Sequence, residues 1–212
     1  MIKAVLFDLD GTLLDTNRLI LESFKYTFKK HLNINVNDEE IIKYFGEPLK
    51  TTLERYSREK LQDMFETYIK FNFDKHDEMT TIMDGVEETL KQLNEIGVKT
   101  AVVTSKREVM ARKGLKLFNI EKYFETVITP EMTNSHKPDP DPIYKACENL
   151  SISPIDAIMV GDSSFDILCG KNAGSKTCLV NYTLLDKNEI NKYKPDYSVN
   201  KIEDLVDIVK CF

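Results

Sequence analysis

The sequence predicts an α/β fold, a doubly wound parallel sheet with a helical domain inserted after its first strand. Short strand-like runs that are apolar on both faces alternate with amphipathic helical patterns, as in sheets covered by helices on both sides. Between residues 16 and 81, in contrast, the patterns are helical only. We therefore expect residues 1–15 and 82–212 to form the sheet-containing core and residues 16–81 to form a helical cap domain.

The first strand-like run is 2–7 (IKAVLF), and helical patterns follow it. The segment 19–32 (LILESFKYTFKKHL) is amphipathic with helical spacing. Further helical patterns occupy 38–45, 48–56 and 60–71. We interpret the aromatic residues of this region as the core of the helical domain: Phe24, Tyr26, Phe28, Phe65, Tyr68 and Phe71.

From residue 82 onward, strands and helices alternate. The helical patterns lie at 85–96, 107–117, 142–150, 164–173 and 201–209. The strand-like runs lie at 98–103, 125–129, 157–160 and 176–180. Gly97 and Gly174 are placed to end helices, and Pro142 suits a first helical turn. This alternation predicts right-handed crossovers and a parallel sheet.

The composition is that of an ordinary globular protein. The 212 residues are 42% hydrophobic and 30% charged, which is enough apolar material for a sizeable core. The formal net charge of -6 gives no general attraction to nucleic acid or anionic membranes, and no apolar run is long enough to span a bilayer. Since no signal-peptide pattern is visible, we expect a cytoplasmic protein. From the charge and the lack of an apolar span we expect no nucleic-acid or membrane partner. We also expect a monomer or weak dimer.

The four cysteines and three histidines are scattered along the chain. None of them has the spacing of a zinc site, and no Ser-His-Asp pattern is visible. We expect reduced thiols that are mostly buried.

Polar residues follow the predicted strands, at the edge where ligands bind in open α/β sheets. Asp8 and Asp10 come directly after the first strand. Hydroxyls, lysines and further aspartates follow the later strands: Thr104, Ser105, Lys106, Lys137, Asp162 and Asp166. Because crowded carboxylates repel one another, we expect a divalent cation with oxygen ligands, Mg²⁺, to join them.

These residue types suit phosphoryl transfer through a covalent intermediate. Once a metal offsets the charge of an incoming phosphoryl group, Asp8 can act as a nucleophile and form an aspartyl-phosphate. Asp10 can protonate the leaving oxygen and later deprotonate the attacking water. Thr104 and Lys137 can stabilise charge on the phosphoryl oxygens.

Other residues are expected to contact a small phosphorylated substrate. Gly11 would let the chain turn closely and free backbone N–H groups for phosphate oxygens, with Thr12 beside it. Ser105 and Lys106 could contact the substrate or only cap the next helix. In the helical domain, Lys50, Asn72 and His76 could face the substrate, although a histidine of this kind is often an ordinary half-buried side chain.

Together these motifs resemble the haloacid dehalogenase (HAD) superfamily of phosphohydrolases over essentially the whole chain. DLDGT at 8–12 resembles its first motif, Thr104 its second, Lys137 its third and GDSSFD at 161–166 its fourth. The resemblance implies a Rossmann-like core, with Mg²⁺ held by the Asp8 carboxylate, the Asp10 carbonyl and Asp162. Asp166 would be a water-mediated or indirect partner of the metal.

A narrower resemblance is to the cytoplasmic pyrophosphatases of this superfamily, which are tied to turnover of a serine-phosphorylated sugar-transport protein. It rests on 15–27 (DTNRLILESFKYT), 68–79 (YIKFNFDKHDEM), 137–146 (KPDPDPIYKA) and 170–177 (GKNAGSKT). It implies hydrolysis of inorganic pyrophosphate to two phosphates. The run 163–165 (SSF) departs from the more polar run expected there. The alternatives are a phosphatase of phosphoglycolate or another small phosphomonoester, a sugar phosphomutase, and a phosphate-binding regulator without activity.

Overall fold

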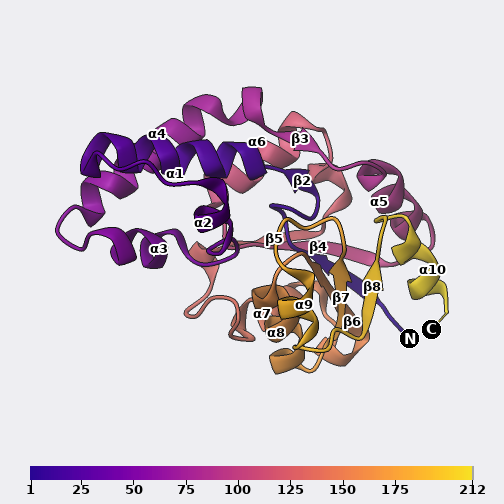
Figure 1. Ribbon diagram of the computed structural model, residues 1–212. Helices are drawn as coiled ribbons and strands as arrows, with labels where there is room; N and C mark the ends of the chain where they lie inside the picture. Colours follow the sequence, from indigo (N-terminus) through magenta and orange to yellow (C-terminus); the bar gives the residue numbers. More distant parts are fainter. Residues whose placement is uncertain (212) are drawn as a thin grey trace.

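The computed structural model describes residues 1–211 and contains a six-stranded parallel sheet (Figure 1). The strands, in spatial order, are β5 (Thr126–Ile128), β4 (Lys99–Val103), β1 (Ala4–Phe7), β6 (Ala157–Gly161), β7 (Lys176–Val180) and β8 (Tyr197–Val199). In register, Phe7 lies opposite Val102 on β4 and Val160 on β6. The central strand β1 therefore ends between the ends of β4 and β6, which brings their following loops together.

Helices cover both faces of the sheet, as the two-sided apolar strands predicted. One apolar cluster contains Val5 and Phe7 with Leu90 of α5 (Val86–Glu95) and Leu205 of α10 (Asp204–Lys210). The opposite cluster contains Leu6 with residues of α7 (Asp141–Leu150) and α8 (Ser164–Ala173). Alternate residues of β1 thus face opposite clusters, and the predicted doubly wound α/β fold is confirmed.

The remaining core helices are α6 (Glu108–Leu117) and α9 (Lys187–Asn191), with short 3₁₀ turns at Glu121–Tyr123, Pro130–Met132 and Pro154–Asp156. Sequence analysis missed α9 and β8, because five and three residues are too short to show a period. It also began the last helix at residue 201, whereas α10 begins at Asp204.

Four helices form a layer beside the sheet domain, and we call them the helical insert: α1 (Asn17–Leu32), α2 (Asp38–Ile42), α3 (Leu49–Tyr56) and α4 (Leu61–Met79). They enclose their own apolar core of Phe24, Phe28, Ile41, Leu53, Met64 and Tyr68. A short antiparallel pair, β2 (Leu14–Asp15) and β3 (Thr81–Ile82), joins the chain where it enters and leaves the insert. The predicted domain boundaries stay a prediction.

Helix α4 is longer than the predicted 60–71. It continues to Met79 because Tyr68, Asn72 and His76, each four residues apart, share one buried face. Sequence analysis missed this last part of the helix because the residues on its buried face, Asn72 and His76, are polar and do not show apolar spacing.

Two further expectations concern the thiols and the membrane. Cys147, Cys169 and Cys178 are buried and unpaired, and Cys211 is exposed and unpaired. Among residues 1–211, no helix combines the length and the apolar character needed to cross a bilayer.

Candidate active site

The ends of β1, β4 and β6 bring three predicted site residues to one edge of the sheet. The backbone N–H of Asp8 donates to the carbonyl of Val160, 2.8 Å away, which extends the β1–β6 pairing by one residue. The N–H of Thr104 likewise donates to the carbonyl of Ile128 at 3.0 Å. Asp8, Thr104 and Asp162 are all nearly buried. Their positions follow directly from the order of the strands.

Lys137 links this edge to the loop that precedes α7. Its ammonium lies 2.6 Å from Oδ1 of Asp8 and 2.6 Å from Oδ1 of Asp166, and it donates to the carbonyl of Val103 at 3.2 Å. The Lys137–Pro138 peptide bond is cis. Burial by itself lowers the pKa of Lys137, but Asp166 and Asp8 raise it well above its ordinary value. Lys137 is therefore a buried, permanently charged ammonium between two carboxylates.

Asp166 has both oxygens engaged by protein donors. Oδ1 accepts from Lys137, and Oδ2 accepts from the Ser163 hydroxyl at 2.6 Å and the Ser163 N–H at 3.1 Å. The bond from the Ser163 N–H is one half of a capping box at the start of α8, and in the other half the Ser163 hydroxyl oxygen accepts from the backbone N–H of Asp166. Asp166 thus stabilises the helix start and holds Lys137 at the same time.

Asp162 lies between the loop after β1 and the loop after β7. Its Oδ2 accepts a hydrogen bond from the Thr183 hydroxyl at 3.0 Å. The same Thr183 oxygen accepts from the N–H of Leu185 at 3.1 Å, so its proton is directed to Asp162. Burial, then repulsion from Asp166 and Asp8, raises the pKa of Asp162 well above its ordinary value.

Three carboxylates, those of Asp8, Asp162 and Asp166, could hold a metal ion. One oxygen from each lies within 4.8 Å of the others, and all three residues are buried. Burial raises the pKa of Asp8 to about 7, against the lowering effect of Lys137. Three buried carboxylates thus face a single ammonium, and this excess of negative charge fits a hard divalent cation with oxygen ligands.

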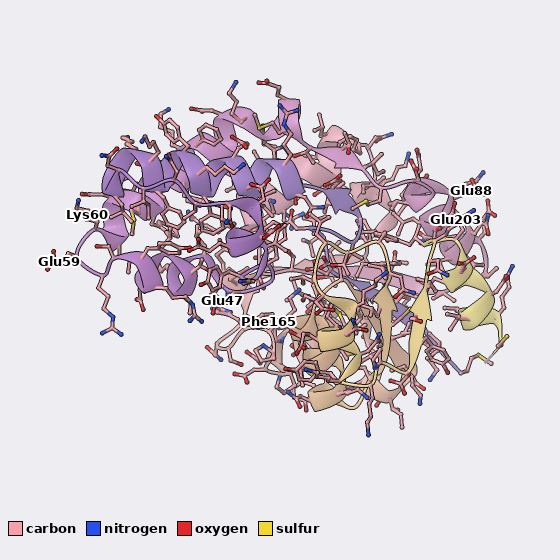
Figure 2. All side chains as sticks on the ribbon, viewed as in Figure 1. Glu47, Glu59, Lys60, Glu88, Phe165 and Glu203 are labelled. Carbon is pink, nitrogen blue, oxygen red and sulfur yellow. The ribbon has the colours of Figure 1, made fainter. Side chains whose placement is uncertain are left out.

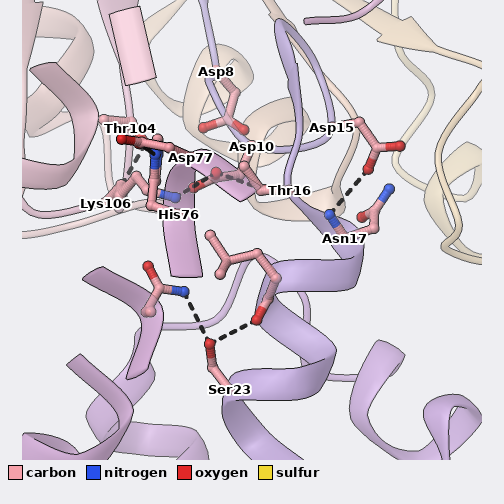
Figure 3. A network of polar contacts seen from close by, with 12 residues as sticks. Asp8, Asp10, Asp15, Thr16, Asn17, Ser23, His76, Asp77, Thr104 and Lys106 are labelled. Atoms are coloured by element: carbon pink, nitrogen blue, oxygen red, sulfur yellow. Dashed lines mark hydrogen bonds and ion pairs between the residues drawn. The ribbon is translucent and has the colours of Figure 1, made fainter. Parts of the chain in front are cut away.

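Asp10 makes a separate ion pair with Lys106 (Figure 3). Oδ1 of Asp10 accepts from the Lys106 ammonium at 2.6 Å and from the Thr16 hydroxyl at 2.7 Å. Within residues 1–211, Oδ2 of Asp10 has no hydrogen-bond donor. The N–H of Lys106 donates to the Thr104 hydroxyl at 3.1 Å. Lys106 was expected to contact the substrate or to cap the next helix, and the sequence did not indicate that it contacts Asp10. Its contact with the substrate stays a prediction.

Gly11 forms a close turn beside the site, as the sequence analysis expected, but its own N–H is engaged within the chain. Its N–H donates to the carbonyl of Leu14 at 2.8 Å, so this particular N–H is not free for phosphate, and the expected contact of other backbone N–H groups of the turn with phosphate stays a prediction. Its φ of 78° is in the left-handed region, and a Cβ there would lie 2.5 Å from Oδ2 of Asp162. Gly11 therefore allows the loop after β1 to approach Asp162 closely.

Thr12 and Ser105 differ in their access to the site. Thr12 is fully buried and does not line the cavity described below, and its carbonyl accepts from the Tyr182 hydroxyl at 2.9 Å. Its expected contact with substrate has no support in this geometry. Ser105 does line the cavity, and its buried hydroxyl has no partner among residues 1–211.

A cavity of about 780 Å³ lies between the strand ends and the helical insert. Asp8, Asp10, Thr104, Lys106, Lys137 and Asp162 line it from the core. Lys50 and Asn72 line it from the insert, as predicted for residues that could face a substrate. The Lys50 ammonium lies 5.2 Å from the centre of the Phe65 ring, and Asn72 donates to the Ser23 hydroxyl at 3.2 Å.

His76 does not line this cavity. Its side chain is completely buried, Nδ1 lies 2.9 Å from Oδ1 of Asp77, and its ring lies next to Gly114 of α6. Burial, against the opposing effect of Asp77, lowers the pKa of His76. The expected substrate contact of His76 is therefore replaced by a packing contact between α4 and α6.

Sequence analysis missed Tyr182 and Thr183. Both follow β7, and they contact Thr12 and Asp162 respectively. The signal was available, because the polar run after the strand 176–180 obeys the same strand-end rule that identified the other site residues.

Comparisons with known proteins agree with this geometry. Residues 5–180 match the family described as haloacid dehalogenase-like hydrolase. The chain is 50% identical over 210 residues to a Clostridium perfringens protein provisionally named pyrophosphatase PpaX, covering 99% of this chain and 98% of that protein. It is 41% identical over 208 residues to pyrophosphatase PpaX of Halalkalibacterium halodurans, covering 98% and 97%. The crystal structure of a predicted phosphatase from Clostridium acetobutylicum superposes with a TM-score of 0.90 at 29% identity, covering 100% of both chains.

Proposed function

The chain belongs to the haloacid dehalogenase-like hydrolases and is a phosphohydrolase, and from this premise we propose that it hydrolyses inorganic pyrophosphate to two phosphates through an aspartyl-phosphate on Asp8. The choice of pyrophosphate is supported by the full-length relatives named as pyrophosphatases. The observation that carries the chemistry is the buried Asp8 carboxylate at the floor of the cavity, held by Lys137 beside Asp162.

We assign Mg²⁺ as the cofactor because the donors are carboxylates and lie beside the phosphoryl site. Asp8 and Asp162 are the better placed direct ligands, since both oxygens of Asp166 already accept from protein donors. Bound there with the Asp10 carbonyl, Mg²⁺ supplies the positive charge that lets an anionic carboxylate approach an anionic phosphate. Thr183 is a positioning residue, because its hydroxyl orients the Asp162 carboxylate.

In the first step, an oxygen of Asp8 attacks one phosphorus of pyrophosphate, and the bond from that phosphorus to the bridging oxygen breaks. Lys137 holds the Asp8 carboxylate in place and balances its charge. The hydroxyl oxygen of Thr104 already accepts a hydrogen bond from the N–H of Lys106. Its own proton is therefore available to donate to a phosphoryl oxygen. Asp10 delivers a proton to the leaving phosphate through its unoccupied Oδ2.

In the second step, Oδ2 of Asp10 takes a proton from water, and the water oxygen attacks the phosphorus of the aspartyl-phosphate. The bond between phosphorus and the Asp8 oxygen breaks, which releases the second phosphate and restores the carboxylate. Lys106 and Thr16 hold Asp10 in position for both proton transfers by donating to Oδ1. The insert above the cavity excludes bulk water while the intermediate exists.

Lys50 is the proposed contact for the leaving phosphate. It lines the cavity from the insert, and its ammonium lies over the Phe65 ring without a carboxylate at ion-pair distance among residues 1–211. A cation without a carboxylate partner in the same cavity as the nucleophile is suited to a leaving group that is itself an anion. The cytoplasmic location and the monomeric or weakly dimeric state stay predictions.

The test is phosphate release from pyrophosphate, phosphoglycolate and hexose phosphates, with Mg²⁺ and with EDTA. We expect release from pyrophosphate to exceed that from the monoesters, to stop in EDTA, and to fall by several orders of magnitude in Asp8→Asn. Asp207→Asn, an exposed aspartate on α10, is the matched control and should keep full activity. Activity retained by Asp8→Asn would refute the covalent route, and isomer exchange of a sugar phosphate without release would indicate a mutase.

A further inference from the structure

His76 is a buried histidine at the place where the insert is joined to the core. Its side chain is completely buried, near the end of α4. A Cβ on Gly114 of α6 would lie 2.6 Å from Cδ1 of Leu14 and 3.4 Å from Nε2 of His76. Leu14 belongs to β2, where the chain enters the insert. The imidazole therefore packs where α4, β2 and α6 meet, and only a glycine on α6 allows this close approach.

The two nitrogens of the His76 ring have different surroundings. Nδ1 lies 2.9 Å from Oδ1 of Asp77, and the same oxygen accepts from the ammonium of Lys113 on α6 at 2.6 Å. Hydrogen bonds from Lys113 and His76 lower the pKa of Asp77, so its carboxylate is ionised and can only accept. Nδ1 of the neutral ring therefore carries the proton. Nε2 is buried and has no hydrogen-bond partner among residues 1–211.

A proton on Nε2 would be costly in this position. The charged groups that act on the ring are Asp77 on its own helix, Lys113 on α6, and Lys106 in the loop before α6 (Figure 3). β2 contributes the apolar side chain of Leu14. Protonation adds a buried positive charge near two ammonium groups, and an N–H for which the surrounding residues provide no acceptor. Burial first, then these ammonium groups, lower the pKa of His76 against the effect of Asp77.

The insert contacts the core at a second place, away from this junction. There, a Cβ on Gly46 would lie 3.0 Å from Cδ2 of Phe165. Figure 2 shows the neighbouring Glu47 close to Phe165. His76, in contrast, packs beside the β2–β3 pair through which the insert is attached. Loss of packing at His76 would therefore let the whole insert, including the Gly46 loop, move relative to the core.

We propose that His76 is a pH-sensitive positioning residue, whose neutral imidazole holds the insert against α6 and whose protonation by solvent at Nε2 releases the insert from the core. The consequence for activity rests on the proposed function. Lys106 precedes α6 and Thr16 follows β2, and both donate to Oδ1 of Asp10. A displaced insert loosens this hold on Asp10 and opens the cavity to bulk water. The protein thus keeps its closed arrangement at neutral pH and loses it in acid.

The first test follows protonation and docking with Mg²⁺ and without substrate. Nuclear magnetic resonance follows the imidazole signals of His31, His76 and His136 from about pH 8 to about pH 4.5. We expect His76 to titrate below 6.5, its ordinary value. Amide hydrogen exchange in 72–79 and in α6, corrected for the pH dependence of the exchange chemistry, should rise with the same midpoint. A His76 ring that titrates at or above 6.5 or stays neutral throughout, or exchange that does not follow it, would overturn the inference.

Two variants that cannot be protonated at this position separate a switch from a purely structural role. His76→Asn keeps an N–H donor for Asp77, and His76→Phe keeps a ring. Both should lose the rise of exchange in acid, and thermal unfolding at neutral pH verifies that each is folded. His31→Asn is the matched control, because His31 lies on α1 and contacts Thr67, and it should behave like the unaltered protein. A rise that persists in His76→Asn or His76→Phe would refute the role of His76.

The pH dependence of kcat/KM for pyrophosphate measures the effect on catalysis. The catalytic carboxylates titrate in every variant, so the ratio of kcat/KM between the unaltered protein and His76→Asn isolates the contribution of His76. We expect this ratio to fall by at least about tenfold in acid, with the midpoint at which His76 titrates. The corresponding ratio for His31→Asn should stay constant. A ratio for His76→Asn that does not depend on pH would refute the positioning role.

The two proposals fail in different ways. Pyrophosphate hydrolysis without a His76-dependent change in exchange refutes the inference and leaves the proposed function intact. Exchange that follows the protonation of His76, in a protein that does not hydrolyse pyrophosphate, supports the release of the insert and refutes pyrophosphate as the substrate. If neither is observed, both proposals are refuted.

Discussion

The ammonium of Lys137 lies 2.6 Å from Oδ1 of Asp8, although 129 residues separate the two along the chain. The same ammonium contacts Oδ1 of Asp166 and the carbonyl of Val103. This one side chain therefore joins the residue after β1, the last residue of β4 and the helix that follows β6. The arrangement leads to four predictions about charge, metal binding and contact between insert and core.

Removing the ammonium of Lys137 should disrupt both stability and activity. In Lys137→Gln two buried carboxylates lose their counter-charge, and we expect a loss of about 3–5 kcal/mol in the free energy of unfolding without metal. Lys145→Gln, which breaks an exposed pair with Glu148, should cost less than about 1 kcal/mol. Urea unfolding of both variants measures the difference, and equal losses would contradict the role given to Lys137.

The Thr183 hydroxyl should control metal affinity. Thr183→Val removes the donor to Asp162 while nearly keeping its volume, and we expect metal binding to weaken by about 10–100-fold. Thr183→Ser keeps the hydroxyl and should bind like the unaltered protein. Binding of Mn²⁺ to the substrate-free protein, followed by electron paramagnetic resonance, tests this directly. Unchanged affinity in Thr183→Val would show that the hydrogen bond has no influence on the metal.

Stability without metal should fall as pH rises. Asp8 releases its proton near its ordinary value of 3.8 when unfolded but near 7 when folded, and the pKa of Asp162 is raised as well. Between about pH 4 and 7 the folded state therefore binds more protons, and the free energy of unfolding decreases with pH. Asp162→Asn should flatten this dependence and raise the melting temperature at pH 7.5, by about 2–4 °C per kcal/mol gained.

Calorimetric scans at pH 5 and 7.5, each with and without Mg²⁺, provide the measurement. Because the metal binds the ionised carboxylates, Mg²⁺ should stabilise the protein more at pH 7.5 than at pH 5. It should have little effect on Asp162→Asn at either pH. Because the lowered pKa of His76 acts in the opposite direction over this pH range, the comparison with Asp162→Asn is decisive: the same change in melting temperature from pH 5 to pH 7.5 in both proteins without metal would contradict the charge repulsion assigned to this cluster.

Contact between Gly46 and Phe165 should matter for catalysis. Gly46 and Gly97 have similar positive φ values, 85° and 77°, but only Gly46 would bring a Cβ against neighbouring atoms. Both alanine variants should lose about 1–2 kcal/mol from backbone strain. Only Gly46→Ala should also lower kcat/KM, by roughly tenfold to a hundredfold, because the insert is displaced from the core. Steady-state kinetics decide, and equal kcat/KM in the two variants would refute the idea.

The run Ser163-Ser164-Phe165 illustrates what a sequence pattern conveys only in part. Its low polarity stood out, and the structure explains it by the packing of Phe165 against Gly46 of the insert. Neither residue alone indicates this contact, because it depends on how two distant loops meet.

The sequence by itself determined the alternation of strands and helices, and with it the edge where Asp8, Thr104 and Asp162 lie. Apolar runs and their polar ends are local features, and parallel strands bring such ends together wherever they occur in the chain. Only the tertiary structure decided that Lys106 contacts Asp10, that Thr183 orients Asp162, and that His76 lies against α6 rather than in the cavity. The physical reason is that the orientation of these side chains depends on how α4, α6 and the loop after β7 pack. That packing is made by contacts between residues far apart in the sequence.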